Sequence, residues 1–293
     1  MRIALASCRD LPDWEVDDAP LHEALRRRGA EVLCPAWDDG DFDWAACDAC
    51  LIRTTWDYME RRDEFVAWSV RIARQTHLFN PPEIVRWNTH KSYLRDLEQQ
   101  GAAVIPTVWL EAGQDVDASA IMRARGWARG FLKPVIGATA RETLRFDADA
   151  EGLAAAQAHL VGMLARESMM LQPYFDSVET EGEISAIFFD GRFSHAVRKV
   201  PVPGDYRVQD DFGARDEPYN MRPGELEIAR GVVGLVRPAP LYARVDFLRD
   251  HAGRLCCNEL ELVEPSLFFR HCPSAAHTLA TCVLSRVAAA RQP

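Results

Sequence analysis

Apolar and polar positions along the first 80 residues follow two different periods. Short apolar runs predict strands at residues 2–6, 31–34, 49–54 and 77–79. Between them, amphipathic stretches at 18–28 and 60–74 predict helices, the first of which ends at Gly29. Because strands that alternate with helices are typical of parallel sheets, we expect a small parallel α/β domain over residues 1–82, which ends at the helix-breaking Asn80-Pro81-Pro82.

The remainder of the chain predicts an α+β arrangement. Strands are expected at residues 104–110, 130–134, 143–146, 169–174, 183–189 and 193–200, and helices at 89–100, 118–125, 150–166, 224–236 and 275–290. Asp190-Gly191 has the sequence of a two-residue hairpin turn between the last two of these strands. We expect these elements to form a central unit over residues 83–172 and a C-terminal unit over residues 173–293.

Three carboxylates lie on two alternating stretches near the end of the chain. Asp246 occupies the less apolar face of residues 241–247, and Glu259 and Glu261 alternate with leucines. Turn-forming residues 250–253 predict a hairpin that sets the two strands side by side. Side chains two apart on a strand lie about 6.6 Å apart on one face, where two carboxylates repel unless water or a cation separates them. The pattern indicates a Mg²⁺ site, with solvated glutamates on an exposed strand as the alternative.

Composition restricts the class of protein. The net charge of −10 argues against a nucleic-acid binder, which would show a basic face. No apolar run approaches the roughly 20 residues of a membrane span, and the apolar start is too short for a signal peptide. The eight cysteines are scattered, which favours reduced thiols in a cytoplasm. We therefore expect a cytoplasmic protein that binds neither nucleic acid nor membrane.

Two lysines lie where phosphate could be their partner, in a chain with few lysines and many arginines. Lys133 lies in an apolar strand, where a buried amine needs an anion or loses its proton, unless the strand is at an edge and the amine reaches water. Lys91 begins a helix and would otherwise be an ordinary solvated residue. Because the chain has no dinucleotide-binding glycine fingerprint and no P-loop, nucleotide binding must rely on lysines and a metal.

Two further segments carry binding groups. Gln172-Pro173-Tyr174 ends an apolar strand, where the proline interrupts pairing and leaves backbone groups that could bind an adenine edge; an ordinary edge-strand proline is the alternative. Arg53, Trp56 and Asp57 lie at the C-terminal end of a parallel strand, where open α/β sheets bind ligands. Arg53 could pair with a carboxylate, Asp57 with an ammonium, and Trp56 or Tyr58 could wall the pocket, so we expect an amino-acid-like substrate. Packing of this loop against the next domain is the alternative.

Taken in order, these motifs resemble those of the ATP-grasp superfamily, and in particular its glutathione-synthetase-like and RimK-like branch, over residues 80–268. The resemblance implies an ATP-grasp fold of α/β and α+β units. It also implies ATP ligands at Lys91, Lys133, Gln172, Pro173, Tyr174, Glu179 and Glu183, and two Mg²⁺ ions on Asp246, Glu259 and Glu261. Arg244, Arg207 and Lys199, with Arg198, would stabilise the γ-phosphate or an acylphosphate. The loop 136–142 departs from the glutathione synthetases, because it has only one glycine.

The same resemblance implies an activity. The protein would be an ATP- and Mg²⁺-dependent ligase that converts a small-molecule carboxylate into an acylphosphate, which an amine or aminooxy nitrogen then attacks. The arrangement is also similar to the ATP-grasp ligases of antibiotic biosynthesis that close the D-cycloserine ring, in which both groups belong to one molecule. A non-catalytic ATP sensor and a kinase-like protein are the alternatives, although the intact carboxylates argue against a sensor. Because this branch is often dimeric or tetrameric, a homo-oligomer is expected.

Overall fold

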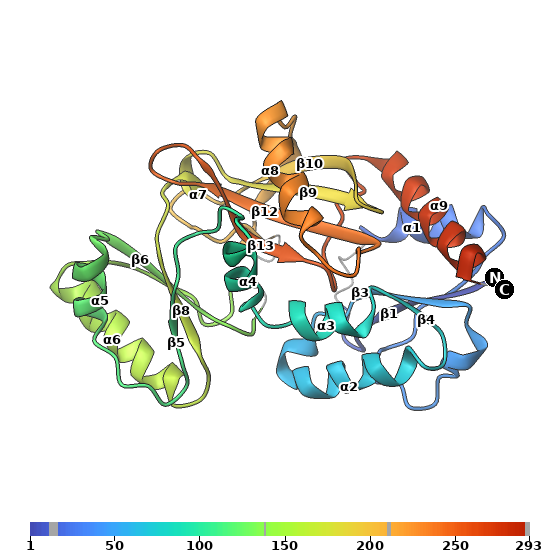
Figure 1. Ribbon diagram of the computed structural model, residues 1–293, viewed down its shortest axis with the longest axis horizontal. Helices are drawn as coiled ribbons and strands as arrows, with labels where there is room; N and C mark the ends of the chain where they lie inside the picture. The colour runs from blue at the N-terminus through green and yellow to red at the C-terminus, as the bar shows by residue number, and fades with distance from the viewer. Residues whose placement is uncertain (12–16, 138, 210–211, 291–293) are drawn as a thin grey trace.

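The computed structural model describes residues 1–11, 17–137, 139–209 and 212–290, which form three sheets with their helices (Figure 1). The first is a parallel sheet of order β2-β1-β3-β4, made of β1 (Arg2–Ser7), β2 (Glu31–Leu33), β3 (Ala49–Thr54) and β4 (His77–Phe79). The helices α1 (Ala19–Arg26) and α2 (Arg62–Ile72) follow β1 and β3, and two short 3-10 turns span Trp44–Ala46 and Tyr58–Arg61. The small parallel α/β fold predicted for the start of the chain is confirmed.

The second sheet is antiparallel and lies at the left of Figure 1. Its order is β5-β8-β6-β7, from β5 (Val108–Leu110), β6 (Arg129–Pro134), β7 (Leu144–Asp147) and β8 (Met169–Pro173). The helices α5 (Ala118–Arg125) and α6 (Ala150–Leu164) pack with Leu132 of β6 and Leu171 of β8 in one apolar cluster. Because neighbouring side chains on a strand face opposite ways, Phe131 and Lys133 lie on the other face of this sheet.

The third sheet is antiparallel, with the order β11-β10-β9-β12-β13. Its strands are β9 (Glu183–Phe189), β10 (Arg192–Val200), β11 (Arg215–Pro218), β12 (Tyr242–Arg249) and β13 (Leu255–Glu261). The short helix α7 (Ser177–Thr180) precedes β9, and α8 (Pro223–Gly234) packs on one face of the sheet. The terminal helix α9 (Pro273–Ala290) packs against α1 and joins the core of this sheet to that of the N-terminal domain.

The boundary at Asn80 is a buried junction. The Asn80 side chain accepts a hydrogen bond from the Leu241 N–H at 2.6 Å and donates to the carbonyls of Tyr242 and Leu262 at 3.0 and 2.8 Å. The Tyr242 hydroxyl in turn donates to the Ile52 carbonyl of β3 at 2.8 Å. These bonds satisfy polar groups that would otherwise be buried without partners, and they fix the N-terminal domain to the third sheet.

The structure differs from the sequence prediction in several elements, and the short helix α7 is one that was not predicted. The helix expected at residues 89–100 is α4 (Tyr93–Gln99), and a separate helix, α3 (Pro82–Asn88), precedes it. Although α4 falls in the predicted central unit, Leu94 and Leu97 pack with Leu260 of the third sheet. The strand β11 was not predicted. The strand expected from residue 104 begins only at Val108, because Val104 instead forms a bridge with Cys257.

Candidate active site

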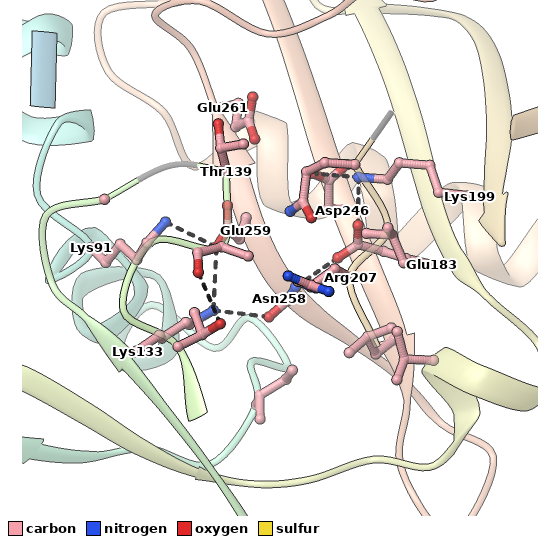
Figure 2. A pocket seen from close by; sticks show the side chains of 18 of the residues that line it. Lys91, Lys133, Thr139, Glu183, Lys199, Arg207, Asp246, Asn258, Glu259 and Glu261 are labelled. Atoms are coloured by element: carbon pink, nitrogen blue, oxygen red, sulfur yellow. Dashed lines mark hydrogen bonds and ion pairs between the residues drawn. The ribbon is translucent and has the colours of Figure 1, made fainter. Parts of the chain in front are cut away.

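One cavity lies where the three units meet, and it brings together most of the residues that the sequence singled out (Figure 2). The sequence contains only three lysines, Lys91, Lys133 and Lys199, and all three line this cavity. They come from three different places: the segment between α3 and α4, strand β6, and strand β10. The chain is acidic overall, yet all three of its lysines line this one cavity. The cavity is therefore suited to an anion with several charges.

The predicted hairpin is confirmed, and its register places the carboxylates opposite one another. Asp246 of β12 pairs with Glu259 of β13, and Arg244 pairs with Glu261. The next pair is Phe247 with Cys257, so Asn258 is an extra residue in a β-bulge. Strict alternation would turn Asn258 away from Glu259, but both side chains contact the same amine.

Glu259 is the counter-ion of two lysines. Lys91 Nζ lies 2.9 Å and Lys133 Nζ 3.3 Å from Glu259 Oε1, and Lys133 also donates to Asn258 Oδ1 at 3.0 Å (Figure 2). Burial would raise the pKa of Glu259, but the two lysines outweigh it and hold this pKa at about 2. Burial, opposed by Glu259 and helped by Lys91, lowers the pKa of Lys133. The two lysines are therefore held close together by one carboxylate.

Asp246 lies in a second cluster on the other side of the cavity. Arg244 donates to it at 2.8 Å, Ser185 Oγ at 2.5 Å, and Lys199 Nζ lies 3.4 Å from it. Lys199 also forms an ion pair with Glu183, which in turn accepts from Asn258 at 2.6 Å. Burial would raise the pKa of Asp246, but Arg244 and Lys199 outweigh it and lower this pKa. Asn258 therefore links the Lys133 cluster to the Lys199 cluster.

The donor set of these clusters fits Mg²⁺. Burial, and the repulsion from Asp246 and Glu259, raise the pKa of Glu261 to about 7 although Arg244 opposes them. A hard cation would relieve that repulsion, and carboxylate oxygens are the ligands that Mg²⁺ prefers. In the described part of the chain, no three carboxylates, histidines or cysteines are grouped to hold a metal on their own. Each carboxylate faces a lysine or Arg244 instead, so a metal here needs phosphate oxygens to complete its ligands.

The segment predicted to bind adenine also lines the cavity. Gln172, Pro173 and Tyr174 contribute there, beside Phe131 of β6. Gln172 donates to Thr107 Oγ1 at 2.8 Å, which fixes its side chain. Glu179, predicted for the ribose, does not line the cavity; its carboxylate accepts from the Tyr174 hydroxyl at 2.5 Å and from Arg145 at 2.8 Å.

Two loops line the cavity beside this segment. The loop 136–143, glycine-poor as the sequence shows, contributes Gly137, Thr139 and Arg141 to the lining. The second loop, after β10, contributes Tyr206 and Arg207. The Tyr206 hydroxyl lies 3.0 Å from Thr143 Oγ1, so the two loops are linked. Arg207 Nη2 donates to Asp205 at 2.7 Å, and Arg198, an ion pair of Glu217, does not line the cavity.

The substrate residues expected in the N-terminal domain are separated by the fold. Trp56 lines the cavity, but Arg53 and Asp57 do not. Arg53 is buried and donates to both oxygens of Asp18, at 2.8 and 2.9 Å. Asp57 accepts from the Trp37 indole at 2.8 Å and from Arg61 at 3.2 Å. The charges that suggested an amino-acid site are therefore neutralised by partners within the domain, which the local sequence did not reveal.

Among the cavity residues that were not predicted as site residues are Asn88, Tyr93, Asn258, Glu264 and Ser266. Asn88 and Tyr93 bind the backbone of β13, at Leu260 and Leu262, and so hold the carboxylate strand in place. Only Asn258 carried a signal in the sequence, since it precedes Glu259 directly. The others become visible only when the segments are brought together.

Comparison with known proteins shows the family of this chain. The family model described as "D-cycloserine synthetase DcsG, N-terminal domain" matches residues 3–80. The Cycloserine biosynthesis protein DcsG of Streptomyces lavendulae is 36% identical over 270 residues, which cover 86% of this chain and 88% of that protein. The chain belongs to the DcsG family of ATP-grasp ligases.

Solved structures place this DcsG-family chain in the same fold. The crystal structure of D-cycloserine synthetase DcsG has a TM-score of 0.87 and 30% identity, and covers 98% of this chain and 100% of its own. The ATP-grasp ligase PsnB, solved with minimal precursor, Mg and ADP, has a TM-score of 0.66 and 16% identity, and covers 97% and 98%. The ATP-grasp fold expected from the sequence motifs is confirmed. In the described residues, no helix is long and apolar enough to cross a membrane.

Proposed function

We propose that this DcsG-family ligase uses Mg-ATP to activate the carboxylate of a small amino-acid-like molecule, and that an aminooxy nitrogen of the same molecule closes the D-cycloserine ring. The observation that carries the proposal is the single cavity in which all three lysines face the Asp246/Glu259 hairpin. The substrate follows from the relatives named for cycloserine, because opening the ring amide of that product gives D-3-aminooxyalanine.

The lysines and carboxylates have complementary tasks in this proposal. Lys91 and Lys133 would break their ion pairs with Glu259 and would themselves bind phosphates of the nucleotide. Each would act as a point charge, one on either side of the phosphates. Asp246, Glu259 and Glu261 would hold Mg²⁺, which neutralises charge on the transferring phosphoryl group when it is bound. Phe131 and Gln172–Tyr174 would contact the base. The number of ions, which we expect to be two, is part of the proposal.

The chemistry has two balanced steps. A carboxylate oxygen of the substrate attacks the γ-phosphorus, and ADP leaves with the electrons of the broken P–O bond. The aminooxy nitrogen then attacks the acyl carbon, phosphate leaves, and the nitrogen gives up a proton to phosphate or water. Arg244 and Lys199, which flank Asp246, would stabilise the negative charge of the transferring group and of the departing phosphate.

Turnover of D-3-aminooxyalanine with Mg-ATP tests the proposal. We expect ADP, phosphate and D-cycloserine in equal amounts, measured by coupled phosphate release and mass spectrometry. With hydroxylamine present, the acylphosphate should be trapped as a hydroxamate, which neither an ATP sensor nor a kinase would give. Phosphate release with no ring product and no hydroxamate would contradict the proposed reaction.

The homo-oligomer expected from the sequence stays a prediction. Sedimentation velocity at two protein concentrations measures it directly. A single species at the mass of one 33.0 kDa chain would contradict it.

A further inference from the structure

One end of the cavity is built from two units. Trp56 and Tyr58 reach it from the segment after β3, and Glu264 and Ser266 reach it from the segment after β13. The Trp56 indole donates to the backbone carbonyl of Glu264 at 3.3 Å, so the two segments are joined. Neither segment contributes a residue that is assigned to the base or to the phosphates, and Arg244 donates to the Ser266 carbonyl at 3.2 Å. It is the part of the cavity that remains for the substrate.

Glu264 differs from the other carboxylates that line the cavity. Each of the others has a cation as its partner: Glu183 has Lys199, Asp246 and Glu261 have Arg244, and Glu259 has Lys91 and Lys133. Across the ranges that the structure describes, no ion pair joins Glu264 to a lysine, arginine or histidine. A carboxylate that faces a ligand cavity without a cation is suited to a ligand that brings one.

The surroundings of Glu264 do not offset the burial of its carboxylate. Tyr58 lies beside this carboxylate and lowers its pKa, and the Tyr58 ring stacks on Phe65 at 5.1 Å between ring centroids. Burial, followed by the negative charge of Glu261, raises the pKa of Glu264 to about 8, although Tyr58 and the positive charge of Lys91 oppose them. A positive group placed against this carboxylate would therefore be stabilised.

We propose that Glu264, oriented by Tyr58, binds the ammonium group of the amino-acid substrate and makes the ligase select carboxylates that carry an amino group. Arg244, which donates to the Ser266 carbonyl, and Glu264 both line the cavity, so a ligand that carries both charges finds a cation and an anion there. Asp57, the ammonium partner expected from the sequence, is already bound to Trp37 and Arg61 outside the cavity. The inference rests on the proposed function, because it assigns one group of that substrate.

Two substrates that differ only in the amino group measure the selection. D-3-aminooxyalanine carries the α-amino group, and 3-aminooxypropionate lacks it. We expect the wild-type protein to favour the first in kcat/KM by about 100-fold, since a site built to bind an N–H group rejects an analogue without it. In Glu264→Gln this preference should fall by about tenfold or more, mainly through KM of the aminated substrate, while the Kd of an ATP analogue stays unchanged.

Two variants complete the experiment. Tyr58→Phe keeps the ring but removes the hydroxyl that orients Glu264, so it should reduce the preference by a smaller factor than Glu264→Gln. Asp57→Asn is the matched control, because it removes a nearby carboxylate that does not line the cavity, and it should keep the wild-type preference. The preference is a ratio, so it does not depend on how much of each variant is folded, and binding of the ATP analogue reports folding separately.

The outcomes separate this inference from the proposed function. If Glu264→Gln keeps the wild-type preference, or loses activity equally with both substrates, the assignment of the ammonium to Glu264 is wrong and the proposed reaction stands. If wild-type protein turns over neither substrate, the proposed function fails, and the inference fails with it. If Asp57→Asn alone removes the preference, the ammonium belongs to Asp57.

Discussion

Lys133 Nζ lies 3.3 Å from Glu259 Oε1, although the two residues come from different sheets and stand 126 positions apart. In the structure, Lys133, which is proposed to bind phosphate, thus neutralises Glu259, which is proposed to bind Mg²⁺. A nucleotide that binds the lysine must displace the carboxylate, and the displaced carboxylate then needs a cation. This relationship ties the binding of nucleotide to the binding of metal.

Glu259→Gln tests that exchange. Without Mg²⁺, the variant should bind ATP several-fold more tightly than the wild type, because the lysines no longer have a competing carboxylate. With Mg²⁺, turnover should fall by about 100-fold, since Glu259 is a proposed ligand of the metal. Isothermal titration with and without Mg²⁺ measures the first effect, and Glu23→Gln, an exposed pair of Arg27, is the control. Near wild-type turnover in Glu259→Gln would show that the metal assignment is wrong.

Amine modification tests whether the three lysines form one anion site. Reductive methylation followed by peptide mass spectrometry should find Lys91, Lys133 and Lys199 all protected by Mg-ATP, with the amino group of Met1 as the unprotected control. Without nucleotide, Lys133 should react before Lys91, because burial lowers the pKa of Lys133 while Glu259 outweighs burial and raises the pKa of Lys91. Equal rates with and without nucleotide would argue against phosphate binding by these lysines.

Tyr206→Phe tests the link between the two loops. The change removes the hydroxyl that lies 3.0 Å from Thr143 Oγ1 but keeps the ring that packs edge-on against Phe131, with 5.2 Å between ring centroids. We expect the nucleotide to dissociate several-fold faster, because loop closure retains it. Stopped-flow fluorescence with a labelled ATP measures the rate, and Tyr219→Phe, outside the cavity, serves as control. An unchanged rate would mean that the link does not hold the loops closed.

Glu225→Gln tests a buried charge far from the chemistry. Glu225 accepts from the Arg222 N–H at 2.8 Å and pairs with Arg249, and with Tyr219 these partners outweigh burial and lower the pKa of Glu225. A pKa lower in the folded than in the unfolded state stabilises the fold above the ordinary pKa of the group, and this stability is lost as pH falls through the folded-state pKa.

We therefore expect Glu225→Gln to cost about 2 kcal/mol of unfolding free energy at pH 7, and progressively less below about pH 4. Urea denaturation at several pH values measures the cost. Glu227→Gln, an exposed position of the same helix, should cost little at any pH. A cost for Glu225→Gln that does not change with pH would show that the charge of Glu225 does not carry the stability.

Local pattern alone determined several parts of this protein. The alternation in 241–247 and 257–262 set Asp246, Glu259 and Glu261 toward one side of a hairpin, and the observed register agrees. The strand and helix periods of the first 80 residues gave the parallel N-terminal sheet, and the apolar setting of Lys133 predicted its burial. These features could be predicted because they depend on immediate neighbours in the sequence. Those neighbours decide on which face of a strand or helix a side chain lies, and whether a charged side chain needs a partner.

Only the tertiary structure decided which partners meet. It bound Arg53 to Asp18, placed α4 on the third sheet, and inserted Asn258 as a bulge so that it faces Lys133 together with Glu259. It also joined Trp56 to the Glu264 carbonyl, from segments about two hundred residues apart in the chain. The sequence indicates which groups need a charge or a hydrogen bond. Their partners, however, come from distant segments of the chain. The distance and register of those segments are set by packing of the whole chain.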